Sequence, residues 1–336
     1  TNDRPAPIMS VRQFQDNMLF DFDAIKAQCQ PPPTCPAPVA CKNEEIASTE
    51  RKRPINRHIS PKIVTGSPKS LCLPRLHGLD DIASVLIIRQ ESPWDTYQQA
   101  ITYEVAGEVM IASRRTRPSR VVAIRKYRKQ DSRRLIDRFG RLEHVNILSF
   151  HECYIYGDFA FFLVADLPLT LAHVVTSSDL YPTEAELGSI MCQILEGMCY
   201  LAAFGLAHQS LVCSNILLGL DGVIKIAGPE YCMDCTPSQS EAACIAAIPS
   251  IMMQLMQKCD KEASIIGVED LERWPIESAA VGFLSVSGTA ASLETLKKES
   301  LIASRHRPAR DLVVLARVAL LSTQIKCTYH RVHNLT

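Results

Sequence analysis

The chain has 336 residues, and 47% of them are hydrophobic, which suits a globular protein with a sizeable core and argues against global disorder. Its 36 basic and 36 acidic residues cancel, so net charge does not point to a nucleic acid or a membrane surface as a partner. No apolar run approaches the roughly 20 residues of a membrane-spanning helix, and 13 cysteines without a regular framework predict reduced thiols in a cytoplasmic protein, with the nucleus as the alternative.

Residues 1–92 differ in composition from the rest of the chain. Twelve of the 20 prolines lie in the first hundred residues, separated by polar or basic stretches such as Arg51-Lys52-Arg53. A segment of this kind cannot bury enough apolar surface to offset the entropy lost on ordering. We therefore expect a flexible, proline-rich arm over residues 1–92, with at most a short helix around Asp80–Ile88.

Regular elements are predicted from residue 93 onward. Val121–Ile124 and Ala160–Val164 are short apolar runs of the kind that form buried strands. Farther along, Asn215–Leu218 and Val223–Ile226 flank an Asp-Gly pair, which is a hairpin signal.

The clearest helix is predicted over Pro182–Phe204. Thr183 with Glu186 three residues later has the pattern of a capping box, and Gly205 is suited to end the helix. Apolar residues recur on one face at helical spacing: Leu187, Ile190, Met191, Ile194, Leu195, Met198 and Leu201. Strands followed by a long helix and a small hairpin indicate an α+β protein with a strand-rich first half and a helical second half.

Four segments, in the same order and at similar intervals, resemble motifs of protein kinases. Gly107-Glu108-Val109 is similar to the end of the glycine-rich loop, and Val122-Ala123-Ile124-Arg125 to the V-A-I-K strand. His144–Leu148 is similar to the H-P-N-I-V stretch after the C-helix. The spacing from His208 to Asn215 matches the H-R-D-L-x-x-x-N catalytic loop.

Within that family the chain resembles the PAK kinases. Gly219-x-Asp221-Gly222, Cys232 and Thr236-Pro237-x-Gln239-Ser240 resemble the stretch that these kinases carry around their D-F-G segment. Cys244–Met256 resembles the helix that anchors the C-lobe, and Ile276–Ile302 the final helices.

The resemblance implies a bilobal α+β kinase fold over residues 93–303, with a small β-rich N-lobe and a helical C-lobe. The nucleotide cleft would lie near Ala165–Leu167, and residues 304–336 would form a C-terminal helical tail. Remnants of the ATP site would be Gly107, Val109, Ala123, Arg125 and Asn215.

Most residues that phosphoryl transfer needs are replaced at the matching positions. The catalytic aspartate falls at Ser210, which cannot accept the substrate proton at neutral pH. The metal-binding aspartate of D-F-G falls at Gly228, which leaves Asn215 as a vestigial metal ligand. Glu230, two residues after Gly228, could supply a carboxylate only if the loop were remodelled.

The groups that hold the phosphates are altered as well. Arg125 stands in place of the phosphate-binding lysine, and Lys126 should point to the opposite side of the strand. The C-helix glutamate falls at Leu135, with Asp137 as the nearest acid.

The loops that cover the nucleotide and dock the substrate are eroded too. Thr102 and Glu104 replace the first two glycines of the glycine-rich loop, and a carboxylate at 104 would repel phosphates. Only about a dozen residues separate Glu230 from Cys244, so the activation segment should be truncated.

We therefore expect a catalytically inactive pseudokinase that acts as a scaffold or allosteric partner, for example of an active kinase or signalling complex. The alternatives are a weak or atypical ATP-binding serine/threonine kinase and a decayed kinase paralogue. No cofactor is assigned: ATP stays open as a ligand, and magnesium binding should be weak or absent. Protein partners are expected, and neither nucleic acid nor membrane.

Overall fold

The computed structural model describes residues 86–140, 142–258, 266–303, 309–323 and 327–329. They all fall within one of the two units of the chain, Pro61–Thr336. The predicted arm lies outside the described residues, apart from residues 86–92. Among the described residues, no helix combines the length and hydropathy that crossing a membrane requires.

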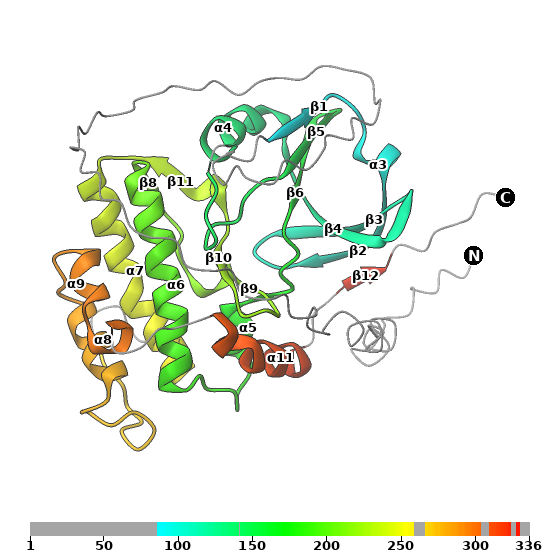
Figure 1. The fold of residues 1–336 in the computed structure, drawn as a ribbon. Helices are drawn as coiled ribbons and strands as arrows, with labels where there is room; N and C mark the ends of the chain where they lie inside the picture. Colours follow the sequence, from blue (N-terminus) through cyan, green and yellow to red (C-terminus); the bar gives the residue numbers. More distant parts are fainter. Residues whose placement is uncertain (1–85, 141, 259–265, 304–308, 324–326, 330–336) are drawn as a thin grey trace, which may run out of the picture. The chain divides into compact units, whose positions relative to one another are not determined.

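A seven-stranded sheet forms the N-lobe, with β6 and β4 near its centre (Figure 1). In spatial order its strands are β1 (Ile87–Arg89), β5 (Glu152–Tyr156), β6 (Phe159–Val164), β4 (Arg117–Arg128), β3 (Glu108–Arg114), β2 (Tyr97–Glu104) and β12 (Cys327–Tyr329). All neighbours are antiparallel except β1 and β5. The strands predicted over Val121–Ile124 and Ala160–Val164 are confirmed as parts of β4 and β6.

The two faces of this sheet carry different cores. Helix α4 (Lys129–Phe139) buries Leu135 and Phe139 in the large core, which also takes in Phe162 from β6. Because side chains alternate along a strand, Met110 and Phe161 point to the other face. They form a smaller core there, against which the side chain of Trp94 in the short helix α3 (Pro93–Thr96) packs.

The folded chain starts earlier than the predicted boundary at residue 93. Ile87–Arg89 is a strand that pairs in parallel with Glu152–Tyr154 of β5. The short helix expected around Asp80–Ile88 falls largely outside the described residues, but Ile87 and Ile88 belong to this strand. Pairing with a sheet edge suits β-branched isoleucine and outweighs a weak local helix signal.

The C-lobe is mainly helical, as the α+β bilobal expectation requires. Its helices are α5 (Leu171–Thr176), α6 (Glu184–Ala203), α7 (Pro237–Gln257), α8 (Ala279–Ser287), α9 (Leu293–Lys297), α10 (Ser300–Ala303) and α11 (Val313–Ser322). Three short strands form one small sheet in the order β10 (Ile224–Ile226), β9 (Ile216–Leu218) and β7 (Leu169–Thr170), and β8 (Leu206–His208) pairs with β11 (Cys232–Asp234).

Helix α6 is the central element of the C-lobe, and its predicted ends are confirmed to within two residues. The Thr183 hydroxyl accepts a hydrogen bond from the Glu186 amide at 3.2 Å, while the Thr183 amide donates to the Glu186 carboxylate at 2.7 Å. Gly205, with φ +67°, follows the helix end.

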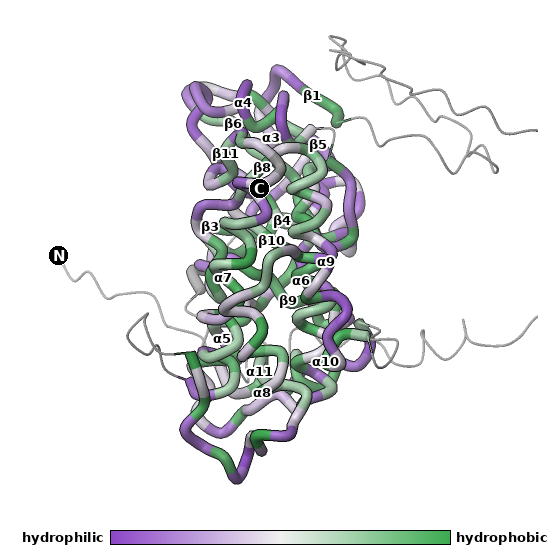
Figure 2. The backbone as a smooth tube through the Cα atoms, turned by 90° about the vertical axis from the view of Figure 1, so that its left-hand side faces the viewer, coloured by the Kyte–Doolittle hydropathy of each residue, from purple (hydrophilic) through white to green (hydrophobic). Residues whose placement is uncertain are grey.

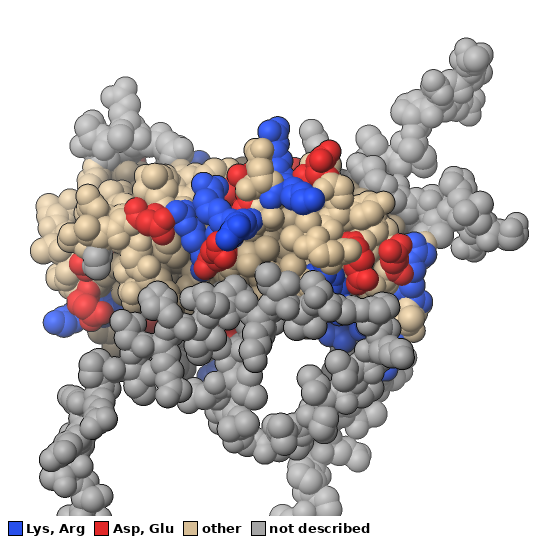
Figure 3. All heavy atoms as spheres, turned by 90° about the horizontal axis from the view of Figure 1, so that it is seen from above, with Lys and Arg blue, Asp and Glu red and all other residues tan. Residues whose placement is uncertain are grey.

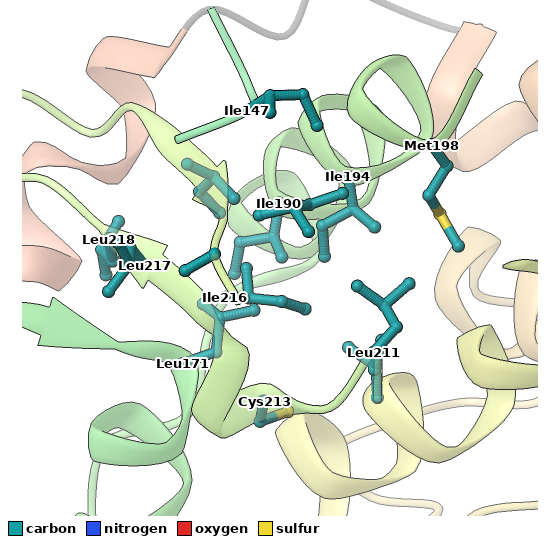
Figure 4. Close-up of a cluster of buried hydrophobic side chains, with 14 of the residues drawn as sticks. Ile147, Leu171, Ile190, Ile194, Met198, Leu211, Cys213, Ile216, Leu217 and Leu218 are labelled. Atoms are coloured by element: carbon teal, nitrogen blue, oxygen red, sulfur yellow. The ribbon is translucent and has the colours of Figure 1, made fainter. Parts of the chain in front are cut away.

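The buried face of α6 packs on the hairpin β9–β10, which is also confirmed. Figure 4 shows Ile190 and Ile194 of α6 turned toward Ile216 of β9 and Met198 turned toward Leu211, and the side chains of the three α6 residues and of Ile216 are fully buried. Burial of each such side chain contributes roughly 1.5–3 kcal/mol of transfer free energy. Helix α4, by contrast, is largely hydrophilic in Figure 2, because only one of its faces is covered.

The start of α7 corrects the sequence analysis, which placed the anchoring helix at Cys244–Met256. The helix begins at Pro237, seven residues earlier, because Thr236 and Gln239 form a capping box. The Thr236 amide donates to the Gln239 side chain at 3.1 Å, and proline suits the first helical turn. Thr236–Ser240 is therefore a helix start, so still fewer residues separate Glu230 from the helix than predicted.

Candidate functional site

Strand β4 directs Arg125 into the interior between the lobes and Lys126 to the outer face of the sheet. The Arg125 side chain is buried, and its guanidinium donates to the carbonyls of Ala106 at 2.5 Å and Val105 at 2.7 Å. The Lys126 ammonium instead lies 3.5 Å from the Glu108 carboxylate on the exposed side. The predicted opposite orientation of the two residues is confirmed. Arg125, which stands where kinases carry the phosphate-binding lysine, is hydrogen-bonded to backbone carbonyls.

The turn between β2 and β3 folds onto this guanidinium. Ala106 and Gly107 both have positive φ, at +50° and +95°, and the Val105 amide bonds the Gly107 carbonyl at 3.0 Å. A Cβ at Gly107 would lie 3.5 Å from the Arg125 Nη1 atom. Since Val105 is also buried, the loop expected to cover phosphates is packed against the arginine.

Of the other residues expected to line the cleft, some are buried in the core and others lie on the surface. Val109 and Ala123 are buried in the large core beneath the sheet. Thr102 lies opposite Met110 on β3, whereas Glu104 is exposed and directly opposite Glu108, a like-charge pair that disfavours this end of the hairpin.

Tyr103 connects β2 to the chain segment that joins the lobes. Its hydroxyl donates to the Asp166 carboxylate at 2.9 Å. Burial raises the pKa of Tyr103, and the carboxylate adds to this because it would repel a phenolate. Loss of solvation raises the pKa of Asp166, although the hydrogen bond from Tyr103 acts in the opposite direction. Sequence reasoning placed the cleft near Asp166 but did not predict this bond.

His208 has a structural position at the start of the catalytic-loop segment. Its Nε2 lies 2.8 Å from the Ala227 carbonyl, while its Nδ1 accepts from the Ser210 amide at 3.3 Å. Burial lowers the pKa of His208, which favours the neutral ring with the proton on Nε2. This histidine fastens the loop to the segment before Gly228.

Ser210 and Asn215, which stand at the catalytic-base and metal-ligand positions, lie next to each other. The Asn215 amide donates to the Ser210 carbonyl at 2.9 Å and to its hydroxyl at 3.2 Å. The structure therefore brings the two positions together as the resemblance predicts, with a hydroxyl in place of a carboxylate.

Gly228 adopts a left-handed conformation at the entrance to the short 3-10 helix Pro229–Tyr231. Its φ is +77°, and a Cβ there would meet the Cδ2 atom of Tyr231 at 2.7 Å. The position that would carry the metal-binding carboxylate is thus closed to a side chain unless Tyr231 moves.

Glu230 turns toward β4, where its carboxylate accepts a hydrogen bond from the Tyr127 hydroxyl. Burial raises the pKa of Tyr127, and this carboxylate reinforces the shift. The Glu230 Oε2 atom and the Arg125 Nε atom are both buried without a hydrogen-bond partner among the described residues.

Helix α4 offers no carboxylate to Arg125. Leu135, at the expected glutamate position, is buried in the core, and Asp137 is exposed, 3.8 Å from Arg133. Sequence reasoning missed Arg138, which donates to the Cys232 carbonyl at 2.9 Å and forms an ion pair with Asp234. The contact joins residues 96 positions apart, so no local signal could have revealed it.

Comparisons with known proteins show similarity to the same family that the motifs resemble. The sequence profile described as protein tyrosine and serine/threonine kinase matches residues 105–249. The chain is 24% identical to serine/threonine-protein kinase CLA4 of Candida albicans over 186 residues, covering 55% of the chain and 18% of that protein. It is 24% identical over 214 residues to serine/threonine-protein kinase pakB of Dictyostelium discoideum, covering 59% of the chain and 25% of that protein.

A mammalian relative has a similar level of identity. Serine/threonine-protein kinase PAK 1 of Mus musculus is 27% identical over 105 residues, which are 31% of this chain and 19% of that protein. The chain therefore spans about a fifth to a quarter of the length of these relatives.

Proposed function

We propose that the chain is a pseudokinase. The premise is that it carries a protein kinase domain, with PAK-like serine/threonine kinases among its relatives at low identity. In this proposal the domain does not transfer phosphate and acts as a scaffold or allosteric partner for other proteins. The observation that carries the proposal is the pair of hydrogen bonds from the buried Arg125 guanidinium to the Val105 and Ala106 carbonyls.

Both terminal nitrogens of the Arg125 guanidinium already donate to backbone carbonyls in this arrangement. A planar guanidinium satisfies two carbonyls at fixed angles, whereas a compact ammonium can move to a ligand. Releasing Arg125 would leave two carbonyls to find other partners, so nucleotide binding has to compete with an existing structure. The replacement of the lysine by Arg125 therefore supports the loss of phosphate binding at this position, even though the positive charge is retained.

The metal and base positions give independent support. Ser210 cannot take a proton at neutral pH, and Gly228 has no ligand atom in its side chain. These residues do not fit magnesium–ATP. Loss of a single electrostatic group in an active site costs about 3 kcal/mol of transition-state stabilisation, and several such losses here act on one reaction without adding linearly.

The room for a substrate platform is reduced as well. Only residues 231–236 lie between Glu230 and α7, and three of them form β11, which pairs with β8. A protein substrate would have nothing comparable to an activation segment on which to dock, which favours a non-catalytic role.

A weak ATP-binding kinase is the second candidate. It is favoured by the retained Asn215 and by the two buried atoms, Arg125 Nε and Glu230 Oε2, that lack hydrogen-bond partners among the described residues. In that case, nucleotide binding would draw Arg125 away from the turn.

Binding of a fluorescent ATP analogue, titrated with and without magnesium, separates the candidates, and competition by unlabelled ATP checks specificity. We expect no magnesium-dependent binding and no phosphorylation of the protein itself or of a generic substrate. Magnesium-dependent transfer that disappears in Asn215→Ala would replace the pseudokinase proposal with the second candidate.

A further inference from the structure

The outer face of the N-lobe sheet carries an aromatic hollow that the kinase motifs do not involve. It has a volume of about 450 Å³, within the range of ligand pockets, and lies over β2, β3, β4 and β6 beside α3. Its apolar lining consists of Trp94, Met110, Phe159 and Phe161. Phe159 is 40% exposed, so part of this apolar surface is open to solvent.

The rings in the hollow are held in fixed positions. Trp94 and Phe161 meet edge to face with centroids 5.7 Å apart, and the Lys126 ammonium lies 5.1 Å from the centre of the Phe159 ring. Lys126 also pairs with Glu108 at this end, so the far end of the hollow is rimmed by an ion pair. Rigid aromatic side chains provide contact area at little entropic cost.

An arginine cluster stands at the opposite end of the same face. It is the β3–β4 hairpin, which carries Arg114, Arg115, Arg117 and Arg120. Arg114 and Arg117 are direct cross-strand partners, a like-charge arrangement that is unfavourable without an anion. Among the described residues, none of the four forms an ion pair.

The hollow and the cluster belong to one continuous surface. Met110 and Arg114 lie four residues apart on β3 and therefore face the same side, about 13 Å apart along the strand. Trp94 contacts both regions, because its backbone carbonyl accepts from the Arg115 Nε atom at 2.9 Å while its ring lines the hollow. An extended peptide of about five residues spans this distance.

The hairpin tip is locally positive, because residues 114–120 contain four arginines and no acidic residue. In Figure 3, seen from above, positive and negative side chains are interspersed, in keeping with a net charge of zero. A hairpin that bears four arginines is therefore complementary to a locally acidic ligand. The arginines gather at one end of the surface instead of following a long track, which fits a short acidic segment better than a nucleic-acid backbone.

We infer that this outer face binds a peptide segment of a partner protein in which a large apolar side chain is followed, a few residues later, by two or more aspartates or glutamates. The apolar residue enters the hollow, and the carboxylates receive the forked donors of Arg114, Arg117 and Arg120. The far end carries the neutral Lys126–Glu108 ion pair and no arginine cluster, so the acidic residues are expected at the hairpin end. The inference goes beyond the proposed loss of catalysis and holds whether or not the cleft binds nucleotide.

The test is fluorescence anisotropy with a labelled 12-residue peptide that contains Leu-Phe, two spacer residues and three glutamates, without nucleotide. We expect binding that weakens about tenfold in the double variant Arg117→Glu/Arg120→Glu and becomes less sensitive to salt. Trp94→Ala should weaken it about thirtyfold, as expected for an aromatic anchor. Phe159→Ala, at a more exposed position, gives the same test if Trp94→Ala does not fold.

The matched control is Arg133→Glu/Arg134→Glu, which makes the same charge change at exposed positions on α4. It should change affinity by no more than about twofold. The inference is overturned if the peptide does not bind at about 1 mM, if the control weakens binding as much as the hairpin variant, if neither aromatic substitution weakens it, or if a 12-nucleotide oligouridylate binds more tightly. The peptide can fail to bind although the cleft is inactive, and it can bind although the cleft is active. The two proposals are therefore tested separately.

Discussion

The Tyr103 hydroxyl and the Asp166 carboxylate, 63 residues apart in sequence, form a 2.9 Å hydrogen bond that ties β2 to the segment between the lobes. Tyr103 is also the backbone partner of Cys327 in β12. The strand that leads into the turn at residues 105–107 is thus fixed by a side chain on one side and by a strand on the other. This arrangement limits the movement of a loop that would have to open for a nucleotide.

Replacing Asp166 with asparagine should change how stability depends on pH. The folded-state pKa of Asp166 is raised, so the native protein holds this proton more tightly, and the group's favourable contribution is lost as pH rises through that pKa. Asparagine keeps an oxygen acceptor for Tyr103 without a charge. We expect Asp166→Asn to unfold at the same temperature as the wild type near pH 4 and at a higher temperature at pH 7.

Thermal unfolding between pH 3.5 and 7.5 measures this difference. Asp158→Asn, at an exposed turn, is the control and should show no such trend. A wild type more stable than Asp166→Asn at pH 7 would mean that the carboxylate gains more from Tyr103 than it loses by desolvation.

Arg125→Lys, which restores the residue that kinases carry, should destabilise the protein by about 2 kcal/mol. A single ammonium cannot reproduce the forked bonds to both Val105 and Ala106, and a charge-assisted bond contributes about 1.5–3 kcal/mol. Urea denaturation gives the free energy of unfolding. Lys126→Arg, on the exposed side of the same strand, should stay within about 0.5 kcal/mol. An unchanged free energy of unfolding in Arg125→Lys would show that the hydrogen bonds from Arg125 to the Val105 and Ala106 carbonyls do not stabilise the fold.

Restoring single catalytic residues should not restore phosphate transfer. Ser210→Asp returns a base without a metal ligand, and Gly228→Asp returns the ligand without a base. Because catalytic groups act as a unit, we expect no activity above background in either variant, and none in the double variant, which still lacks a substrate platform. A kinase assay with a peptide substrate checks this, and a single variant that phosphorylates it would favour the weak-kinase alternative.

Gly228→Asp should also lower the free energy of unfolding, by more than the backbone strain at a positive φ alone would cost. A non-glycine residue at φ +77° costs about 1–2 kcal/mol, and its Cβ would in addition lie 2.7 Å from Tyr231. Gly157→Asp isolates the first effect, because Gly157 has φ +58° and a Cβ added there would meet nothing within 4 Å. The difference in unfolding temperature between the two variants measures the clash, and equal losses would show that Tyr231 moves freely.

Ser240→Ala should cost about 1–3 kcal/mol, because it leaves the buried Leu206 carbonyl without its donor. The Ser240 hydroxyl is fully buried and lies 2.5 Å from that carbonyl, which connects α7 to β8. Ser238→Ala, at an exposed site in the same turn, is the matched control and should have little effect. Similar losses in the two variants, measured by chemical denaturation, would indicate a general effect on the helix start.

Much of the fold could be predicted because its signals are local. The capping residues Thr183 and Glu186 and the apolar period of α6 lie within one helix, and alternation along β4 sufficed to separate Arg125 from Lys126. The start of α7 was wrong although its capping box is present in the sequence. Thr236-Pro237 was compared with the stretch around the D-F-G segment of PAK kinases, and the helix-start signal was overlooked.

The parts of the site that were missed depend on contacts distant in sequence. Arg138 reaches Asp234, and Tyr127 reaches Glu230, only because the shortened segment after Gly228 brings those carboxylates under α4 and β4. Neither pair has a characteristic spacing. The hydrogen-bond partners of Arg125 could not be predicted from the sequence either. They depend on the turn at Ala106 folding inward and not on the identity of residue 125.

The pairing of β12 with β2 gives the two lobes a second connection. Helix α11 contacts α5 and β7 in the C-lobe, and the chain then returns to pair with Ile101–Tyr103 in the N-lobe. Two bodies joined by one linker can swing about it, but a second attachment some distance away removes most of that rotation. Any movement of the N-lobe that carries β2 away from β12 would therefore have to break this three-residue ladder.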